Sequence, residues 1–339
     1  MTSSLRSTMI ATGGVALLLV VLGPLPMSAY VDGRITQAVI FVGLAISWNV
    51  IGGFAGQLSI GQAAFFGVGA YGAAEAVGSH GLGTLPALGV AVVLAAVAAL
   101  IVVPCFRARG AYFAVLTLAL AAIAMRVAER YAPGGNSGIF YEAFEIDSSM
   151  PYLLAAGGVV VAMALCVFVL RSKMGRGLAA VRMDLDAARS VGVRDMATRT
   201  QALLLSAAIA GYFGGLYALT LGFLDPGTAF SLDWSVAPLL AVVLGGMGTL
   251  LGPVIGGAIW FGLEEAITQL GFTSDTALIL QGAILLGIAL AAPRGIVGVA
   301  TDLWRLYRDR DRGEDGADPP PAVEGRPPAS AETGSGVAS

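Results

Sequence analysis

Charged residues are scarce in this chain of 339 residues. They make up 12% of the sequence, whereas soluble domains contain roughly a quarter. Hydrophobic residues make up 57%, and glycine, which is frequent in transmembrane helices, occurs 47 times. This balance excludes an ordinary soluble domain and predicts a polytopic α-helical membrane protein.

Lysine, histidine and cysteine are rarer still. The single lysine, Lys173, is followed by Met174, so the chain contains no G-x-x-x-x-G-K-[ST] loop to hold nucleotide phosphates. Cys105 and Cys166 lie in apolar runs, far apart in sequence, and the lone histidine, His80, lies in a Gly-rich turn. We therefore expect no cofactor, metal or catalytic residue, and we expect any ATP hydrolysis to occur on another subunit.

Carboxylates near the middle of the apolar runs are also scarce. The ionisable residues within the runs lie toward their ends or beside breaks: Glu75, Arg126, Glu129, Glu264 and Glu265. Proton- and sodium-driven carriers usually need a carboxylate near the midplane of the membrane. An intramembrane enzyme needs paired carboxylates, a metal-ligand cluster or a Ser/His pair. The pattern disfavours the carrier and gives no support to the enzyme.

Apolar runs long enough to cross a membrane are abundant. A spanning helix needs about 20 mostly apolar residues. The sequence predicts an all-α fold with about ten spans, at 9–30, 34–54, 58–78, 83–106, 110–131, 151–170, 200–221, 231–250, 252–271 and 276–293. The first span is longer than the apolar core of a usual signal peptide, so we expect it to remain uncleaved.

Positive charge is distributed unevenly around these spans. If the loop 171–199 is cytoplasmic, only three of the 19 Lys+Arg residues fall on or near the outer side: Arg34, Arg126 and Arg130. Because Lys and Arg accumulate in cytoplasmic loops, both termini are expected inside the cell. The membrane domain is predicted to cover 1–303. The polar, Pro-rich tail, 304–339, cannot bury a core and is predicted to be a disordered cytoplasmic segment.

Two Gly-rich stretches interrupt the apolar runs, GGFAGQLSIGQ at 52–62 and LGGMGTLLGP at 244–253. Irregular backbone at membrane depth is tolerated only inside protein or along a water-filled pathway, so both are candidate broken or re-entrant segments. Six residues in or beside them are candidate pathway lining: Asn49, Gln57, Ser59, Gln62, Gly245 and Gly246. Packing and interhelical hydrogen bonding are the alternative roles of each residue taken singly. Small-xxx-small pairs such as Gly211 and Gly215 predict close helix packing.

One basic loop, 171–199, holds seven of the 19 Lys+Arg residues. A stripe of apolar residues recurs in it at helical spacing: Leu178, Val181, Leu185 and Ala188. Charged residues beside this stripe are spaced for ion pairs: Arg182, Asp186 and Arg189. Gly192 is well placed to end the helix in a left-handed conformation. The pattern predicts a short amphipathic helix, 178–191, which either lies on the membrane surface or fills a groove in a soluble partner.

The segment GRGLAAVRMDLDAARSVGV, followed by SAAIAGYFGGLYAL, resembles the cytoplasmic loop and next span of ABC importer permeases, specifically the branched-chain amino acid permeases of the LivM type. The coupling signature of that family, EAA-x3-G, falls on Asp186-Ala187-Ala188 and Gly192, with Asp in place of Glu. Further matches follow in family order over nearly all of 35–300: Asn49 with 52–71, 107–120, 242–257 and 292–298. The chain departs from the pattern at Ala122, which is often Glu in relatives, and at Gln62, which is often His. The acidic cluster of the loop is reduced to Asp184 and Asp186.

The resemblance implies an ABC type II importer-like permease in a bacterial plasma membrane, which is a transport subunit and not an enzyme. It implies a homologous second permease, two cytoplasmic ATPase subunits, an extracytoplasmic solute-binding protein and membrane lipid as partners, with no nucleic acid. Coupling to the ATPase is expected of seven loop residues: Gly175, Arg176, Arg182, Asp186, Ala187, Ala188 and Gly192.

The same resemblance implies branched-chain amino acids as the solute. Urea, short amides or other amino acids carried by the same machinery are the alternative. A self-contained carrier or channel is the alternative from a different class.

Overall fold

The chain folds as a bundle of long helices, because lipid offers no hydrogen-bond partners and each spanning backbone must satisfy its own groups. The computed structural model describes Gly14, residues 29–108, 110–141 and 150–271, and scattered positions between 276 and 298. The elements, in chain order, are α2 (Ala29–Asn49), the π-helix η1 (Val50–Phe54), α3 (Gln62–Gly78), α4 (Thr84–Val102), the 3₁₀-helix η2 (Val103–Arg107), α5 (Ala111–Tyr131), the 3₁₀-helix η3 (Gly135–Ser137), β1 (Ile139–Phe140), α6 (Met150–Arg171), α7 (Lys173–Met183), α8 (Leu185–Ser190), α9 (Asp195–Leu221), β2 (Phe223–Leu224), α10 (Pro226–Ala229), α11 (Asp233–Gly245) and α12 (Gly252–Gln269).

The predicted spans between residues 34 and 271 each coincide with a helix of the described part of the chain. By length and apolar composition alone, six helical segments there can cross a membrane: Gly33–Phe54, Thr84–Arg107, Ala111–Tyr131, Met150–Arg171, Asp195–Leu221 and Pro226–Gly245. The predicted spans 9–30 and 276–293 fall mostly outside the described residues, and the predicted tail 304–339 falls wholly outside them. The all-α polytopic fold is confirmed, and the count of ten helices stays a prediction.

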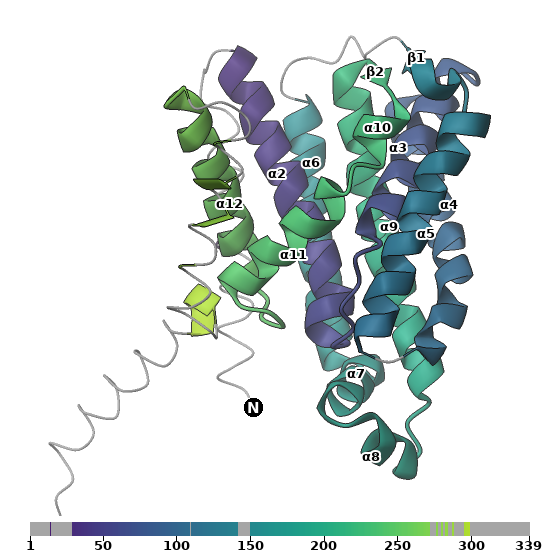
Figure 1. The fold of residues 1–339 in the computed structure, drawn as a ribbon, viewed down its shortest axis with the longest axis vertical. Helices are drawn as coiled ribbons and strands as arrows, with labels where there is room; N and C mark the ends of the chain where they lie inside the picture. Colours follow the sequence, from purple (N-terminus) through teal and green to yellow (C-terminus); the bar gives the residue numbers. More distant parts are fainter. Residues whose placement is uncertain are drawn as a thin grey trace, which may run out of the picture. The chain divides into compact units, whose positions relative to one another are not determined.

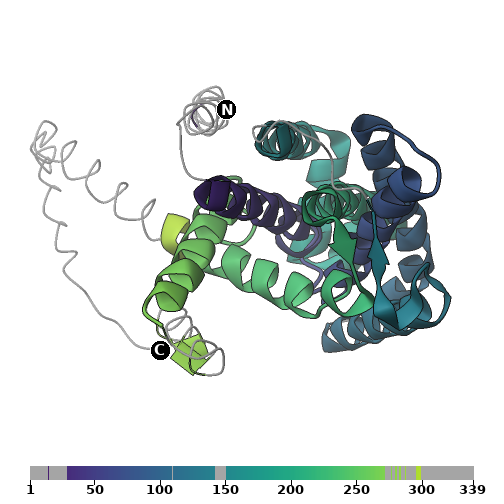
Figure 2. The same cartoon turned by 90° about the horizontal axis from the view of Figure 1, so that it is seen from above.

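Helices α2 and α9 form the centre of the bundle. Their most apolar windows are 83% and 72% buried, whereas the corresponding windows of α4 and α5 are only 28% buried. Helix α9 packs against α2, α3, α4 and α6. Seen from above, α2, α11 and α12 lie on one side of α9, and α4 and α5 lie on the other (Figure 2). The outer helices therefore present apolar side chains to the surroundings, and the central pair is enclosed by protein.

Glycine sets the close contact between α3 and α9. A Cβ atom on Gly69 would overlap the backbone of Gly211, and one on Gly211 would overlap Ala95 of α4. Small residues let helix backbones approach in lipid, where burial of apolar surface gives no driving force. The predicted packing role of the Gly-rich spans is confirmed here.

Both predicted breaks are present, and they lie next to each other. Helix α2 passes into the π-helix η1 and the chain is then irregular until Gln62, while α11 ends at Gly245 and α12 begins at Gly252. The buried Asn49 side chain joins them: its Nδ2 donates to Thr249 O at 2.8 Å, and its Oδ1 accepts from Gly248 N at 2.9 Å.

A small two-stranded sheet was not predicted from the sequence. Strands β1 and β2 pair antiparallel, with Ile139 opposite Leu224 and Phe140 opposite Phe223. Both lie at the end of the bundle opposite α7 and α8 (Figure 1). Two residues per strand are too few for an alternating pattern to stand out in the sequence.

Candidate functional site

The loop 171–199 forms two short helices, α7 and α8, at one end of the bundle (Figure 1). The single helix predicted at 178–191 is wrong, because Asp184 interrupts it with an extended backbone (φ −156°, ψ 119°). Its carboxylate Oδ1 accepts from Asp186 N at 2.8 Å and Ala187 N at 2.9 Å, and so caps the start of α8. Ser172 caps α7 in the same way, with Oγ accepting from Gly175 N at 3.3 Å.

The apolar stripe of the loop faces the membrane helices. Leu178, Val181 and Ala188 are buried, and Leu185 is half-buried. Gly192 adopts the expected left-handed conformation, with φ +84°, and its N–H donates to Arg189 O at 3.0 Å. Both features agree with the predicted amphipathic character, although the stripe runs over two helices.

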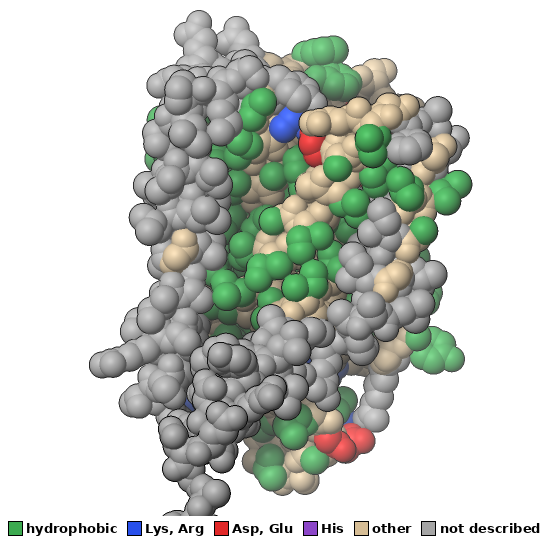
Figure 3. Space-filling view, turned by 90° about the vertical axis from the view of Figure 1, so that its left-hand side faces the viewer, with side chains coloured by type: hydrophobic (Ala, Val, Ile, Leu, Met, Phe, Trp, Pro, Cys, Tyr) green, Lys and Arg blue, Asp and Glu red, His purple; other side chains and the backbone are tan. Residues whose placement is uncertain are grey.

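The opposite face of the loop is open. Met183 is 89% exposed and Val191 is 76% exposed. Asp186, Ala187 and Arg176 are exposed too, whereas Gly175 and Ala188 are buried. Figure 3 shows acidic and hydrophobic side chains together at the lower end of the molecule, where α7 and α8 lie. Sequence reasoning missed Met183 and Val191, which stand just outside the apolar stripe.

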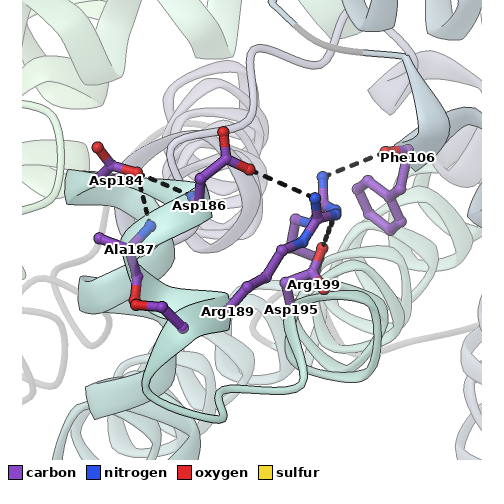
Figure 4. Close-up of polar contacts among 8 residues, drawn as sticks. Phe106, Asp184, Asp186, Ala187, Arg189, Asp195 and Arg199 are labelled. Carbon is purple, nitrogen blue, oxygen red and sulfur yellow. Dashed lines mark hydrogen bonds and ion pairs between the residues drawn. The ribbon is translucent and has the colours of Figure 1, made fainter.

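A chain of polar contacts runs inward from α8 (Figure 4). Arg189 pairs with Asp186 at 3.5 Å on its own helix and donates to Asp195 Oδ2 at 2.8 Å on α9. The hydrogen bond to Asp195 is the main cause that raises the pKa of Arg189 above its ordinary value. Asp195 Oδ2 also accepts from Arg199 Nη2 at 2.6 Å. The carboxylate therefore lies between two arginines, one exposed and one buried.

Arg199 extends this series of polar contacts into the bundle. It is only 2% exposed, its Nη1 donates to Phe106 O at 3.3 Å, and its guanidinium lies 5.1 Å from the centre of the Phe106 ring. Phe106 belongs to η2, between α4 and α5. Through one carboxylate, the loop 171–199 is thus tied to α9 and, by way of Arg199, to η2. Arg199 was counted in the sequence only as part of the basic loop, since its burial depends on the position of η2.

The predicted pathway residue Gln62 lies in a buried polar cluster. Its Nε2 donates to Ser47 Oγ and, at 3.2 Å, to Ser206 Oγ. Ser47 and Ser206 each also donate to the other's backbone carbonyl, at 2.6 and 2.8 Å. The cluster joins α2, α3 and α9, as interhelical hydrogen bonding would.

The other predicted pathway residues lie at the breaks. Ser59 is buried and its carbonyl accepts from Trp48 Nε1 at 2.8 Å, while Gln57 is half-buried. Gly245 and Gly246 are buried where α11 turns into α12. Their role as pathway lining stays a prediction.

A cavity of about 780 Å³ opens at the end of the bundle away from the loop. It lies where α2 begins, where α9 and α12 end, and along α10 and the start of α11, and its lining mixes aromatic and charged side chains: Arg34, Asp225, Asp233, Trp234, Trp260 and Glu264. Arg34 Nε donates to Glu265 Oε2 at 2.7 Å, and its guanidinium lies 4.8 Å from the centre of the Phe261 ring. Figure 3 shows a basic and an acidic side chain side by side near the upper end of a hydrophobic face. The volume is typical of small-molecule sites.

Comparison with known proteins assigns the family. The model of the family described as "Branched-chain amino acid transport system / permease component" matches residues 30–289. The chain belongs to this family. Among its relatives, the LivM permease of the high-affinity branched-chain amino acid transport system of Escherichia coli K12 is 26% identical over 88% of this chain and 77% of its own length. The LivM permease of Salmonella typhimurium is 26% identical over 82% and 72%.

A second type of permease is also related. The LivH permease of E. coli K12 is 30% identical, over 40% of this chain and 43% of its own length. No solved structure matches the chain. As a permease component of the LivM type, the chain is a multi-pass membrane subunit of an ABC transporter and not an enzyme.

Proposed function

We propose that this permease component imports branched-chain amino acids in an ATP-driven complex, and that the loop 171–199 receives the ATPase. One observation carries the proposal: an exposed face at Met183, Asp186 and Val191 is backed by a polar chain that ends inside the bundle. A surface that served only for solubility would need no such connection. The match to the LivM permeases supports the choice of solute.

The complex we propose contains a homologous second permease, two cytoplasmic ATPase subunits and an extracytoplasmic binding protein. The similarity to both LivM and LivH permeases supports a pair of related membrane subunits. In this proposal the loop and both termini lie on the cytoplasmic side of the bacterial plasma membrane, as the distribution of Lys and Arg favours. The cavity lined by Arg34 and Trp260 then faces the binding protein.

The solute enters at this outer cavity and passes the two breaks. The cavity offers charged groups for an ammonium and a carboxylate and aromatic faces for an aliphatic side chain. Asn49 and Gln62 lie farther in, and with Gln57, Ser59, Gly245 and Gly246 they form the inner lining. Specificity resides largely in the binding protein, since tight binding here would slow release.

Reconstitution tests this function. Proteoliposomes that hold the full complex should accumulate radiolabelled leucine with ATP, and unlabelled valine or isoleucine should compete. Asp186→Asn and Gly192→Ala should each lower leucine uptake more than they lower ATP hydrolysis.

Two outcomes would contradict the proposal. Accumulation by this chain alone under a proton or sodium gradient would establish a self-contained carrier. Competition by urea or acetamide with none by valine would assign a different solute to the same machinery.

A further inference from the structure

Arg182 is an exposed residue of the loop, but its guanidinium reaches inward. From the last turn of α7 it extends toward the membrane helices, and its Nη1 donates to Gly53 O at 2.6 Å, across 129 residues of sequence. Gly53 belongs to the π-helix η1, the last turn of the long α2–η1 helix. The loop thus has a second inward link, separate from the chain through Asp195 and Arg199.

The accepting carbonyl lies at a helix C-terminus, where a cation is favoured. The last carbonyls of a helix lack N–H partners from the helix itself, and the helix dipole places partial negative charge there. Beyond η1, Ala55 N bonds Val50 O and Gln57 N bonds Ile51 O. Arg182 supplies a charged donor to the carbonyl of Gly53. A hydrogen bond from a charged donor is stronger than one between neutral groups.

The second break meets the same point. A Cβ on Gly53 would overlap Asn49 Oδ1 and would lie 2.7 Å from Gly248 N. A Cβ on Gly248 would overlap Arg182 Nη1 and would lie 3.1 Å from Gly53 O. Gly248 also has φ +81°, which L side chains rarely adopt. The guanidinium therefore lies against both broken segments at once.

We infer that Arg182 is a positioning residue that transmits movement of α7 to the two broken segments together. This rests on the proposed function, in which the ATPase moves the loop. When α7 shifts, its last turn carries the Gly53 carbonyl with it, and the Asn49 bridge to Gly248 and Thr249 moves the second segment in the same step. Exposed loop residues receive the movement, and Arg182 delivers it to the α2–η1 helix and to the turn between α11 and α12.

The test compares Arg182→Gln and Arg182→Lys in the full reconstituted complex. The first readout is the ratio of leucine imported to ATP hydrolysed, which does not depend on the amount of assembled protein. Arg182→Gln should lower this ratio about tenfold, the loss expected from one charge-assisted hydrogen bond, with ATP hydrolysis kept. Arg182→Lys, which keeps a charged donor, should fall between Gln and the wild type. Arg130→Gln removes one exposed positive charge near the end of α5, outside the loop 171–199, and should leave the ratio unchanged.

A second readout does not depend on the solute. Binding protein should stimulate ATP hydrolysis by the wild-type complex and by Arg130→Gln, and the stimulation should be lost in Arg182→Gln. A wild-type ratio and wild-type stimulation in both Arg182 variants would overturn the inference. So would a parallel fall of uptake and hydrolysis in Arg182→Lys, which would reveal a merely structural role.

The two proposals fail differently. If leucine is the wrong solute, the wild-type complex shows no leucine uptake, and stimulation by the binding protein still decides the role of Arg182. If only the inference is wrong, the wild type imports leucine and the Arg182 variants do so as efficiently. Should Arg182→Gln fail to assemble, the Lys variant decides alone, with an unchanged ratio counting against the inference.

Discussion

A buried arginine with one carboxylate partner dominates the chemistry at the residue scale. Arg199 is 2% exposed and Asp195 is 14% exposed, and their contact of 2.6 Å is supplemented by Phe106. Removing one partner of a buried ion pair leaves an uncompensated charge, whereas replacing both with apolar groups is often neutral. Removing Asp195 alone should therefore destabilise the fold by more than the intact ion pair stabilises it.

Asp195→Ala should strongly destabilise the protein. The expected cost is about 3–5 kcal/mol, because Arg199 would keep its charge without a counterion. The thermal unfolding midpoint of the detergent-purified chain measures the change. The double variant Asp195→Ala, Arg199→Met should recover most of the loss. Asp186→Asn, which removes a 3.5 Å pair whose carboxylate is 70% exposed, should cost about 0–1 kcal/mol. An Asp195→Ala protein as stable as the wild type would show that the pair is dispensable.

At the scale of elements, the two short helices α7 and α8 separate outward contacts from inward ones. Met183 and Val191 project outward, and Leu178, Val181 and Ala188 pack inward. Exposed hydrophobic side chains beside charged ones are typical of docking surfaces, where a few anchors carry most of the affinity.

Met183→Ser with Val191→Ser should weaken association with the ATPase. Loss of two apolar anchors should weaken the affinity for the ATPase by about 30-fold, since each anchor contributes on the order of 1 kcal/mol, and less ATPase should co-purify with this chain. Leu85→Ser serves as the control. Leu85 is 69% exposed and lies at the start of α4, whereas η2 follows the other end of that helix. Equal recovery of ATPase with both variants would place the docking surface elsewhere.

The same elements show what the sequence can predict. Long apolar runs located the helices between residues 34 and 271, and Gly-rich stretches located both breaks, since each depends on local composition. The division at Asp184 was missed because a helix-capping aspartate and a helical aspartate look alike within an amphipathic pattern. The inward course of Arg182 and the burial of Arg199 depend on Gly53 and Phe106, which are distant in sequence. No periodicity within the loop encodes those contacts.

At the scale of the whole molecule, we propose that transport depends on the membrane domain and not on the polar tail. The tail predicted at 304–339 is rich in Pro, Asp and Gly and poor in large apolar residues. We therefore assign the coupling and transport functions to the part of the chain before it.

Truncation after Arg312 should leave transport intact. Leucine uptake per assembled complex should match that of the full chain, since the removed segment contains neither loop 171–199 nor either break. Uptake in proteoliposomes, normalised to the amount of permease, measures this. A large loss would mean that the tail binds a partner or stabilises the assembly.

Helix α9 begins at Asp195, whose carboxylate accepts a hydrogen bond from Arg189 of the loop. Near its other end, Tyr217 lines the outer cavity. The 27 residues of α9 span about 40 Å at 1.5 Å per residue. If α9 tilts as a rigid body by about 5° around its inner end, its outer end is displaced by roughly 3.5 Å. A single rigid element can thus open or narrow the entrance in step with events on the other side of the membrane.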